Sequence, residues 1–181
     1  MKTLLSILLL SFTLFLLCCH KKEPPQPQLP PATQTGAGTF GCKINGQIDT
    51  ANYADNFGAF ATYLHLVYPP EYSFEDGYFL TVHGEKRNKW GITLKTDSLQ
   101  IYEDSTYTLG SHRKGTAYAI YLNYPGTPYY TQDSLEGKMT ITKIDETNQI
   151  ISGTFWFDAI DTITEEKVQV RDGRFDLLYT K

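Results

Sequence analysis

Few of the residues that could carry out chemistry are spaced as a catalytic or metal site requires. Glu75-Asp76 and Glu103-Asp104 are adjacent carboxylates, which face opposite sides when they lie on a strand. A glycosidase needs two carboxyl groups that face each other across a cleft, so a hydrolase is the least favoured function. His65 and His83 fall on neighbouring predicted strands, but zinc needs three or four ligands, and neither H-x-H nor H-E-x-x-H occurs. No nucleophile elbow or phosphate loop appears either, so we expect no enzyme activity, no metal and no cofactor.

Aromatic residues gather in two predicted loops, 69–76 and 125–130. An exposed tyrosine offers a flat apolar face with a polar tip, which suits stacking on a sugar or contact with a protein. If both loops lie at one end of the domain, they form one recognition surface; if the rings fold back, they cover the ends of the core instead. The candidate ligand-binding residues are Tyr68, Tyr72, Phe74, Tyr124, Tyr129 and Tyr130.

The N-terminus has the pattern of an export signal that ends in a lipid anchor. Lys2 precedes an apolar run over residues 4–17, which is shorter than the roughly 20 residues needed to span a bilayer as a helix. Leu16-Leu17-Cys18-Cys19 resembles a bacterial lipobox, and Cys19 is the better lipid acceptor because the small Cys18 then stands before it. The alternatives are a plain secretory signal and a short membrane anchor. We expect lipid on Cys19 to hold the protein in the membrane.

Composition argues for one domain that does not bind nucleic acid. Removal of residues 1–18 takes away only Lys2, so the formal net charge shifts from −4 to −5. Nucleic-acid binding needs clustered Lys and Arg, which this mild acidity disfavours. Cys42 is the one thiol left after lipidation, so we expect no disulfide within the mature chain, and its alternation with Phe40 and Ile44 predicts a buried core position.

The chain divides into a signal peptide (1–18), a proline-rich tether (19–38) and a single domain (39–181). Five prolines stand between residues 20 and 38, where almost nothing is apolar. Such a segment favours extended polyproline II and acts as a semi-rigid spacer. We therefore expect the tether to hold the domain away from the membrane.

Short runs of alternating apolar and polar residues fill the domain and predict an all-β fold. The expected strands include residues 60–68, 77–86, 117–124, 138–144 and 151–157. Helical periodicity is limited to a turn or two at 97–102 and 161–167. Eight to ten short strands separated by turn signals favour an antiparallel β-sandwich, with a partly open β-barrel as the alternative.

Two turn signals make sharper predictions. Asn45-Gly46 is the strongest two-residue hairpin signal, so we expect residues 47–49 to return as a second strand. At Asp172-Gly173 the apolar residues switch from even to odd positions. Either a hairpin or a bulge in one continuous strand explains that switch.

Three segments at the two ends of the domain are distinctive: 38–46 reads GTFGCKING, 151–157 reads ISGTFWF, and 168–176 reads VQVRDGRFD. With these segments the chain resembles a family of uncharacterised lipoproteins from Bacteroidota. The members of that family begin with a GTFGC-x-x-NG strand and end with SGTF-x-F and DG-x-F. The resemblance implies an all-β domain behind a lipobox, with no assigned activity and no catalytic residues to carry over.

Taken together, the sequence predicts a lipid-anchored protein of the bacterial cell envelope, at the outer membrane, that acts as a non-catalytic binding or interaction module. Its partner would be a glycan or another envelope protein. The alternative is a carbohydrate-binding lipoprotein of a glycan-uptake system.

Overall fold

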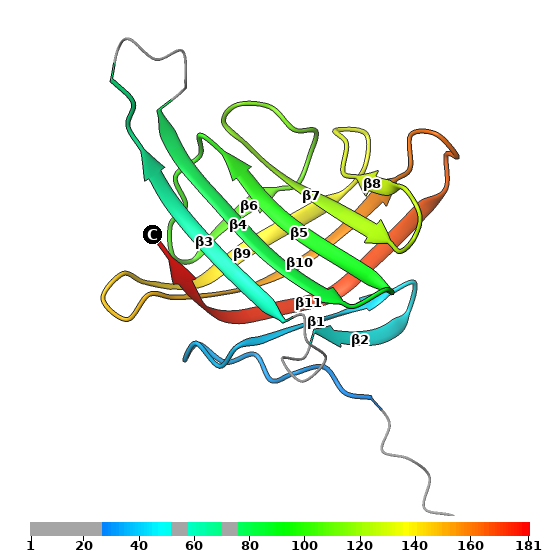
Figure 1. The fold of residues 1–181 in the computed structure, drawn as a ribbon, viewed down its shortest axis with the longest axis horizontal. Helices are drawn as coiled ribbons and strands as arrows, with labels where there is room; N and C mark the ends of the chain where they lie inside the picture. Colours follow the sequence, from blue (N-terminus) through cyan, green and yellow to red (C-terminus); the bar gives the residue numbers. More distant parts are fainter. Residues whose placement is uncertain (1–26, 52–57, 70–75) are drawn as a thin grey trace, which may run out of the picture.

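A computed structural model describes residues 27–51, 58–69 and 76–181, which form eleven strands (Figure 1). The strands are β1 (Thr39–Ile44), β2 (Gln47–Ala51), β3 (Ala59–Leu66), β4 (Gly77–Lys86), β5 (Trp90–Asp97), β6 (Ser105–Thr108), β7 (Thr116–Asn123), β8 (Pro128–Tyr130), β9 (Gly137–Asp145), β10 (Ile150–Ile160) and β11 (Lys167–Thr180). The described residues contain no helix, so 97–102 and 161–167 are not helical, and none of them could cross a membrane as a helix. The all-β prediction is confirmed, with one strand more than expected.

All eleven strands belong to one sheet, in the order β2-β1-β11-β3-β4-β5-β7-β8-β10-β9-β6. A further pairing of β10 with β11 joins the middle strands into a partial ring, beyond which β1–β2 and β9–β6 extend. In Figure 1, β3, β4, β5 and β7 cross over β9, β10 and β11, so two layers of this one sheet face each other, where a sandwich would have two separate sheets. Every named pair of strands is antiparallel except β11 with β3, which is parallel.

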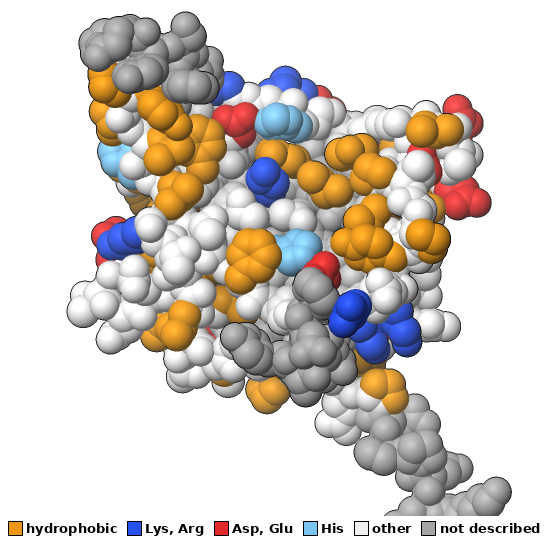
Figure 2. All heavy atoms as spheres, in the orientation of Figure 1, with side chains coloured by type: hydrophobic (Ala, Val, Ile, Leu, Met, Phe, Trp, Pro, Cys, Tyr) orange, Lys and Arg blue, Asp and Glu red, His pale blue; other side chains and the backbone are white. Residues whose placement is uncertain are grey.

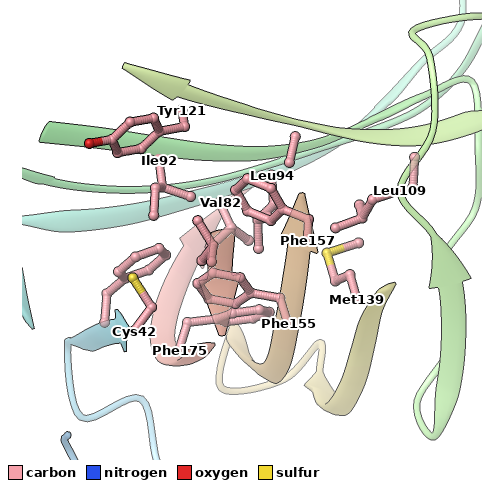
Figure 3. Close-up of a cluster of buried hydrophobic side chains, with 14 of the residues drawn as sticks. Cys42, Val82, Ile92, Leu94, Leu109, Tyr121, Met139, Phe155, Phe157 and Phe175 are labelled. Carbon is pink, nitrogen blue, oxygen red and sulfur yellow. The ribbon is translucent and has the colours of Figure 1, made fainter. Parts of the chain in front are cut away.

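The core lies between these two layers because each strand turns alternate side chains inward. On β10, Ile151, Phe155, Phe157 and Ala159 are all buried. Figure 3 shows aromatic and aliphatic side chains from both layers in contact, and the ring centroids of Phe40 and Phe155 lie 5.2 Å apart.

Cys42 is a fully buried free thiol of this core, as predicted. Burial raises its pKa to about 12, and the negative charge of Asp49 adds to the shift. The thiol is therefore a small apolar core group, with none of the thiolate character that a nucleophile needs.

The predicted hairpin at Asn45-Gly46 is confirmed. Ile44 pairs with Gln47, and the two turn residues have φ values of 48° and 83°. Both values lie in the left-handed region, which asparagine and glycine tolerate better than other residues.

Asp172-Gly173 is a bulge within one continuous strand, so the hairpin alternative is wrong. Against β10, Gly173 pairs with Phe155 and Val170 with Phe157, which leaves two residues of β11 opposite Trp156. Asp172 itself has a φ of 52°. The extra residue moves the apolar side chains from even to odd positions while both halves of β11 keep facing the core.

The segment before β1 is docked on the domain by Asp176, a carboxylate that is only 1% exposed. Thr33 Oγ1 donates to its Oδ2 over 2.6 Å, Thr35 N over 3.0 Å, and Gly36 N donates to Oδ1 over 2.7 Å. These residues belong to the predicted tether (19–38), of which the structure describes 27–38. A spacer that stands free of the domain would therefore be shorter than the predicted range 19–38.

Candidate functional site

A cleft lies where one edge of the sheet is left open beside β3. It has a volume of about 760 Å³ and is lined by residues 63–66 and 100–103, with Tyr78, Ile144, Glu146, Tyr179 and Lys181. We call this set of residues the aromatic cleft. In Figure 2, hydrophobic side chains gather at the upper left, over the end of β3 and the start of β4.

An open strand edge forms part of this cleft. β3 pairs with β4 along its whole length, but on its other side β11 covers only Ala61 and Thr62. Among the described residues, no strand pairs with that second edge over 63–66, the same residues that line the cleft. Such an edge presents backbone N–H and C=O groups to an added strand.

Flat aromatic surfaces stand next to this edge. The rings of His65 and Tyr78, which pair across β3 and β4, are parallel within 3°, with centroids 4.1 Å apart. Tyr63 stacks on the same Tyr78 ring at 5.8 Å. Tyr102 is 57% exposed, and its hydroxyl donates to Gln100 Oε1 over 2.9 Å. The cleft thus combines exposed apolar ring faces with polar groups at their edges.

Two tyrosine hydroxyls in the cleft differ in their hydrogen bonding. Tyr63 Oη accepts a hydrogen bond from Ile101 N over 3.1 Å, and burial raises the pKa of Tyr63 to about 12. Tyr179 is 2% exposed, and its hydroxyl is buried without a hydrogen-bond partner among the described residues. Burial, and then the charges of Glu146 and Asp145, raise the pKa of Tyr179. Both groups stay protonated at neutral pH, and the Tyr179 hydroxyl is a donor without an acceptor.

The carboxylates of the cleft are arranged for structure, because each already has a partner. Glu103 Oε2 accepts from Ile144 N over 3.0 Å, and this hydrogen bond is the main cause of its lowered pKa. Glu146 forms a 3.4 Å ion pair with Lys181. A general acid needs a raised pKa, which Glu103 lacks. Both carboxylates therefore make structural contacts at the cleft.

Tyr68 and Tyr124, two of the aromatic residues that the sequence singled out, lie at opposite ends of the sheet. Tyr68 follows β3, and its N–H donates to Asp76 Oδ1 over 2.6 Å. Tyr124 follows β7, at the end of the sheet where Asn123 pairs with Trp90, and Trp90 pairs with Lys86, the last residue of β4. The loop after Tyr68, by contrast, leads into the first residue of β4. The expectation that both loops share one end is therefore wrong, since the whole of β4 separates them.

Tyr129 and Tyr130 differ in exposure because successive residues of β8 face opposite sides. Tyr129 is buried, packs edge-on against Tyr121 at 5.5 Å, and donates its hydroxyl to Glu166 Oε2 over 3.0 Å. Tyr130 is 40% exposed. Tyr129 is therefore a core residue. The other candidates, Tyr72, Phe74 and Cys19, lie outside the described residues.

The two histidines do not meet on one face. His65 pairs with Tyr78, whereas His83 pairs with Phe60 and bonds Thr93 Oγ1 over 2.9 Å. Burial lowers the pKa of His83, although Glu85 at 3.5 Å works against that shift. Within the described ranges, no group of three or more His, Cys, Asp or Glu is placed to hold a metal ion.

Sequence reasoning missed the cleft because its rings come from separate segments. Tyr63 and Tyr78 lie on paired strands, Tyr102 on the connection to β6, and Tyr179 at the end of β11. The one local signal is the Tyr63-x-His65 alternation on β3, which places both side chains on one face of the strand.

The fold places an open, aromatic-lined cleft at the edge of an all-β domain. The chain belongs to the family described as domain of unknown function DUF6252, whose model matches residues 70–177. The match includes the SGTF and DG-x-F segments and leaves out β1, β2 and β3. No curated protein and no solved structure matches the chain.

Proposed function

We propose that this protein is a non-catalytic binding module that holds an extended segment of another envelope protein in the aromatic cleft. The observation that carries the proposal is the open edge of β3 over residues 63–66, which lies in the same cleft as the exposed rings. An added strand would pair its backbone with this edge, while its alternate side chains contact the rings of His65, Tyr78 and Tyr102.

The chemistry of the cleft supports binding through contact area and hydrogen bonds. Aromatic pairs contribute about 0.5–1.5 kcal/mol beyond the area that they bury. A buried hydroxyl without a partner costs roughly 1–3 kcal/mol, so a ligand carbonyl that reaches Tyr179 would recover part of that cost. Backbone pairing supplies affinity, and the rings select for apolar or aromatic side chains.

The proposed placement is the cell envelope, through lipid on Cys19. The apolar run at residues 4–17 and the lipobox-like Leu16-Leu17-Cys18-Cys19 support it. A diacylated cysteine buries enough methylenes to hold the protein at the membrane, since each contributes about 0.8 kcal/mol. Resemblance to lipoproteins from Bacteroidota favours the outer membrane as the location.

The experiment is a selection of random linear peptides, displayed on phage, against the soluble form that lacks residues 1–26. We expect enriched peptides to carry apolar or aromatic residues at every second position. Synthetic copies with N-methyl groups on one set of alternate amides should lose binding, and copies methylated on the other set should keep it, because only one edge of the added strand faces β3. Enrichment of no peptide, or equal tolerance of both N-methyl series, would contradict the proposal.

A further inference from the structure

A second cleft opens at the other end of β4, between the β1–β2 turn, the β4–β5 turn and the end of β7. Its volume is about 510 Å³. We call it the amide cleft because four of its lining residues carry side-chain amides: Asn45, Gln47, Asn88 and Asn123. It shares no lining residue with the aromatic cleft.

Trp90, which lines the amide cleft, carries a buried indole N–H. Trp90 is 3% exposed, and its Nε1 has no hydrogen-bond acceptor among the described residues. Tyr121 lines the same cleft and is 7% exposed, and in Figure 3 its hydroxyl points away from the phenylalanines of the core. Burial raises the pKa of Tyr121, and the nearby Asp49 adds to that shift. Two residues that line the cleft, Trp90 and Tyr121, therefore carry protonated donors.

The turns hold two of the amides in place. Asn45 and Asn88 have φ values of 48° and 56°, a conformation that asparagine tolerates in turns. Asn45 Oδ1 accepts from Gln169 N over 2.9 Å, which fixes its side chain and leaves the amide N–H groups available. Each remaining amide offers both a donor and an acceptor.

The two charged side chains that line this cleft, Asp49 and Lys89, have opposite signs. The carboxylate of Asp49 already accepts from Lys86 Nζ over 2.9 Å. At the rim, Tyr124 is 37% exposed and lies over the backbone of Gly91, since a Cβ built there would be 3.8 Å from its ring. A ligand for this site needs donors and acceptors in equal measure, little charge, and a face that stacks on tyrosine.

We propose that the amide cleft binds a neutral saccharide. Sugar hydroxyls both donate and accept, as side-chain amides do, and the C–H face of a pyranose stacks on a tyrosine ring such as Tyr124. A sugar oxygen is also the acceptor that the indole N–H of Trp90 lacks. This site is separate from the peptide site proposed above, so either can fail without the other.

The test starts from an array of neutral and anionic oligosaccharides probed with residues 27–181 and with the Tyr102→Ala variant. The best neutral ligand is then titrated against a Trp156→Phe background, in which the fluorescence reports Trp90 alone because the chain has two tryptophans. We expect a saturable fluorescence change that Asn123→Ala and Tyr124→Ala each weaken at least about tenfold. Tyr102→Ala, in the aromatic cleft, should bind as the parent does.

Three results would overturn the saccharide site: no neutral ligand on the array, binding to anionic glycans alone, or affinity that Asn123→Ala and Tyr124→Ala leave unchanged. Gln47→Ala is an independent check, because Gln47 is exposed and its truncation should not impair folding. This variant should bind the same saccharide more weakly and keep the thermal stability of the parent.

Discussion

The imidazole of His65 lies flat on the ring of Tyr78, with centroids 4.1 Å apart and planes 3° apart. The two residues are direct cross-strand partners on β3 and β4, so the register of the hairpin builds the stack. Cross-strand pairs of this kind contribute roughly 0.2–1 kcal/mol. We therefore expect His65→Ala to lower the free energy of unfolding by less than about 1 kcal/mol in urea titrations. A much larger loss would show that the His65 ring is needed for the fold. It would then not be a ring that is available to contact a bound peptide.

Asp176 should make the free energy of unfolding depend on pH in the acid range. Burial by itself would raise its pKa, but hydrogen bonds from Thr33, Thr35, Ser152 and Gly36 outweigh burial and hold the pKa at about 2, below its ordinary 3.8. The charged form is favoured in the folded state, so this stabilisation is complete above pH 4 and is lost as the pH falls toward 2. From these pKa values we expect a loss of about 2 kcal/mol, measured by denaturant unfolding at a series of pH values.

Asp176→Asn is the matched substitution for this effect. The amide cannot accept all of these bonds, so we expect a loss of roughly 2–4 kcal/mol at neutral pH and faster hydrogen exchange at Thr35 and Gly36. Asp133→Asn is the control, since Asp133 is exposed and pairs only with surface groups. It should cost less than about 1 kcal/mol. Equal effects of the two variants would contradict the role given to Asp176.

The bulge in β11 predicts an unusual preference at position 172. Asp172 has a φ of 52° and a 2.7 Å ion pair with Lys43 between exposed side chains. Asp172→Val should destabilise by at least about 1 kcal/mol more than Asp172→Gly, because a β-branched residue is strained at positive φ. In an unbroken strand the order would be reversed, since valine favours strands and glycine weakens them. Thermal unfolding of the two variants distinguishes these outcomes.

The lipid anchor predicts that Cys19→Ser releases the protein from the membrane. We expect wild-type protein expressed in a bacterium to incorporate labelled palmitate and to partition into detergent, and the variant to do neither. Cys42→Ser serves as the control, because Cys42 is buried in the core and should leave labelling unchanged. Unchanged labelling of Cys19→Ser would show that another residue carries the lipid.

Local patterns were sufficient to predict the fold class and several of its details. Asn45-Gly46 specifies its own turn, and the alternation around Cys42 requires only that one face of a strand is buried. The apolar switch at Asp172-Gly173 marked an irregularity, but only the pairing with β10 shows that it is a bulge. What depends on neighbours in the sequence was therefore predictable.

Features that depend on distant segments could not be predicted in the same way. Asp176 binds residues more than a hundred positions away in the sequence. For this reason residues 33–37 were predicted to belong to a tether that stands free of the domain. The aromatic cleft lies beside the parallel contact of β11 with β3, which no local pattern specifies. Tyr129 and Tyr130 are neighbours in the sequence, yet one is buried because of Tyr121 and Glu166.

The central claim is that the aromatic cleft binds an extended peptide. It is tested most directly by the dissociation constant of a selected peptide, measured by calorimetry with wild type, Tyr102→Ala and Tyr130→Ala. Both tyrosines are exposed, at 57% and 40%, but only Tyr102 lines the cleft. We predict that Tyr102→Ala weakens binding at least about tenfold, or 1.4 kcal/mol, while Tyr130→Ala changes it less than about twofold. Equal affinity of all three proteins would contradict the account.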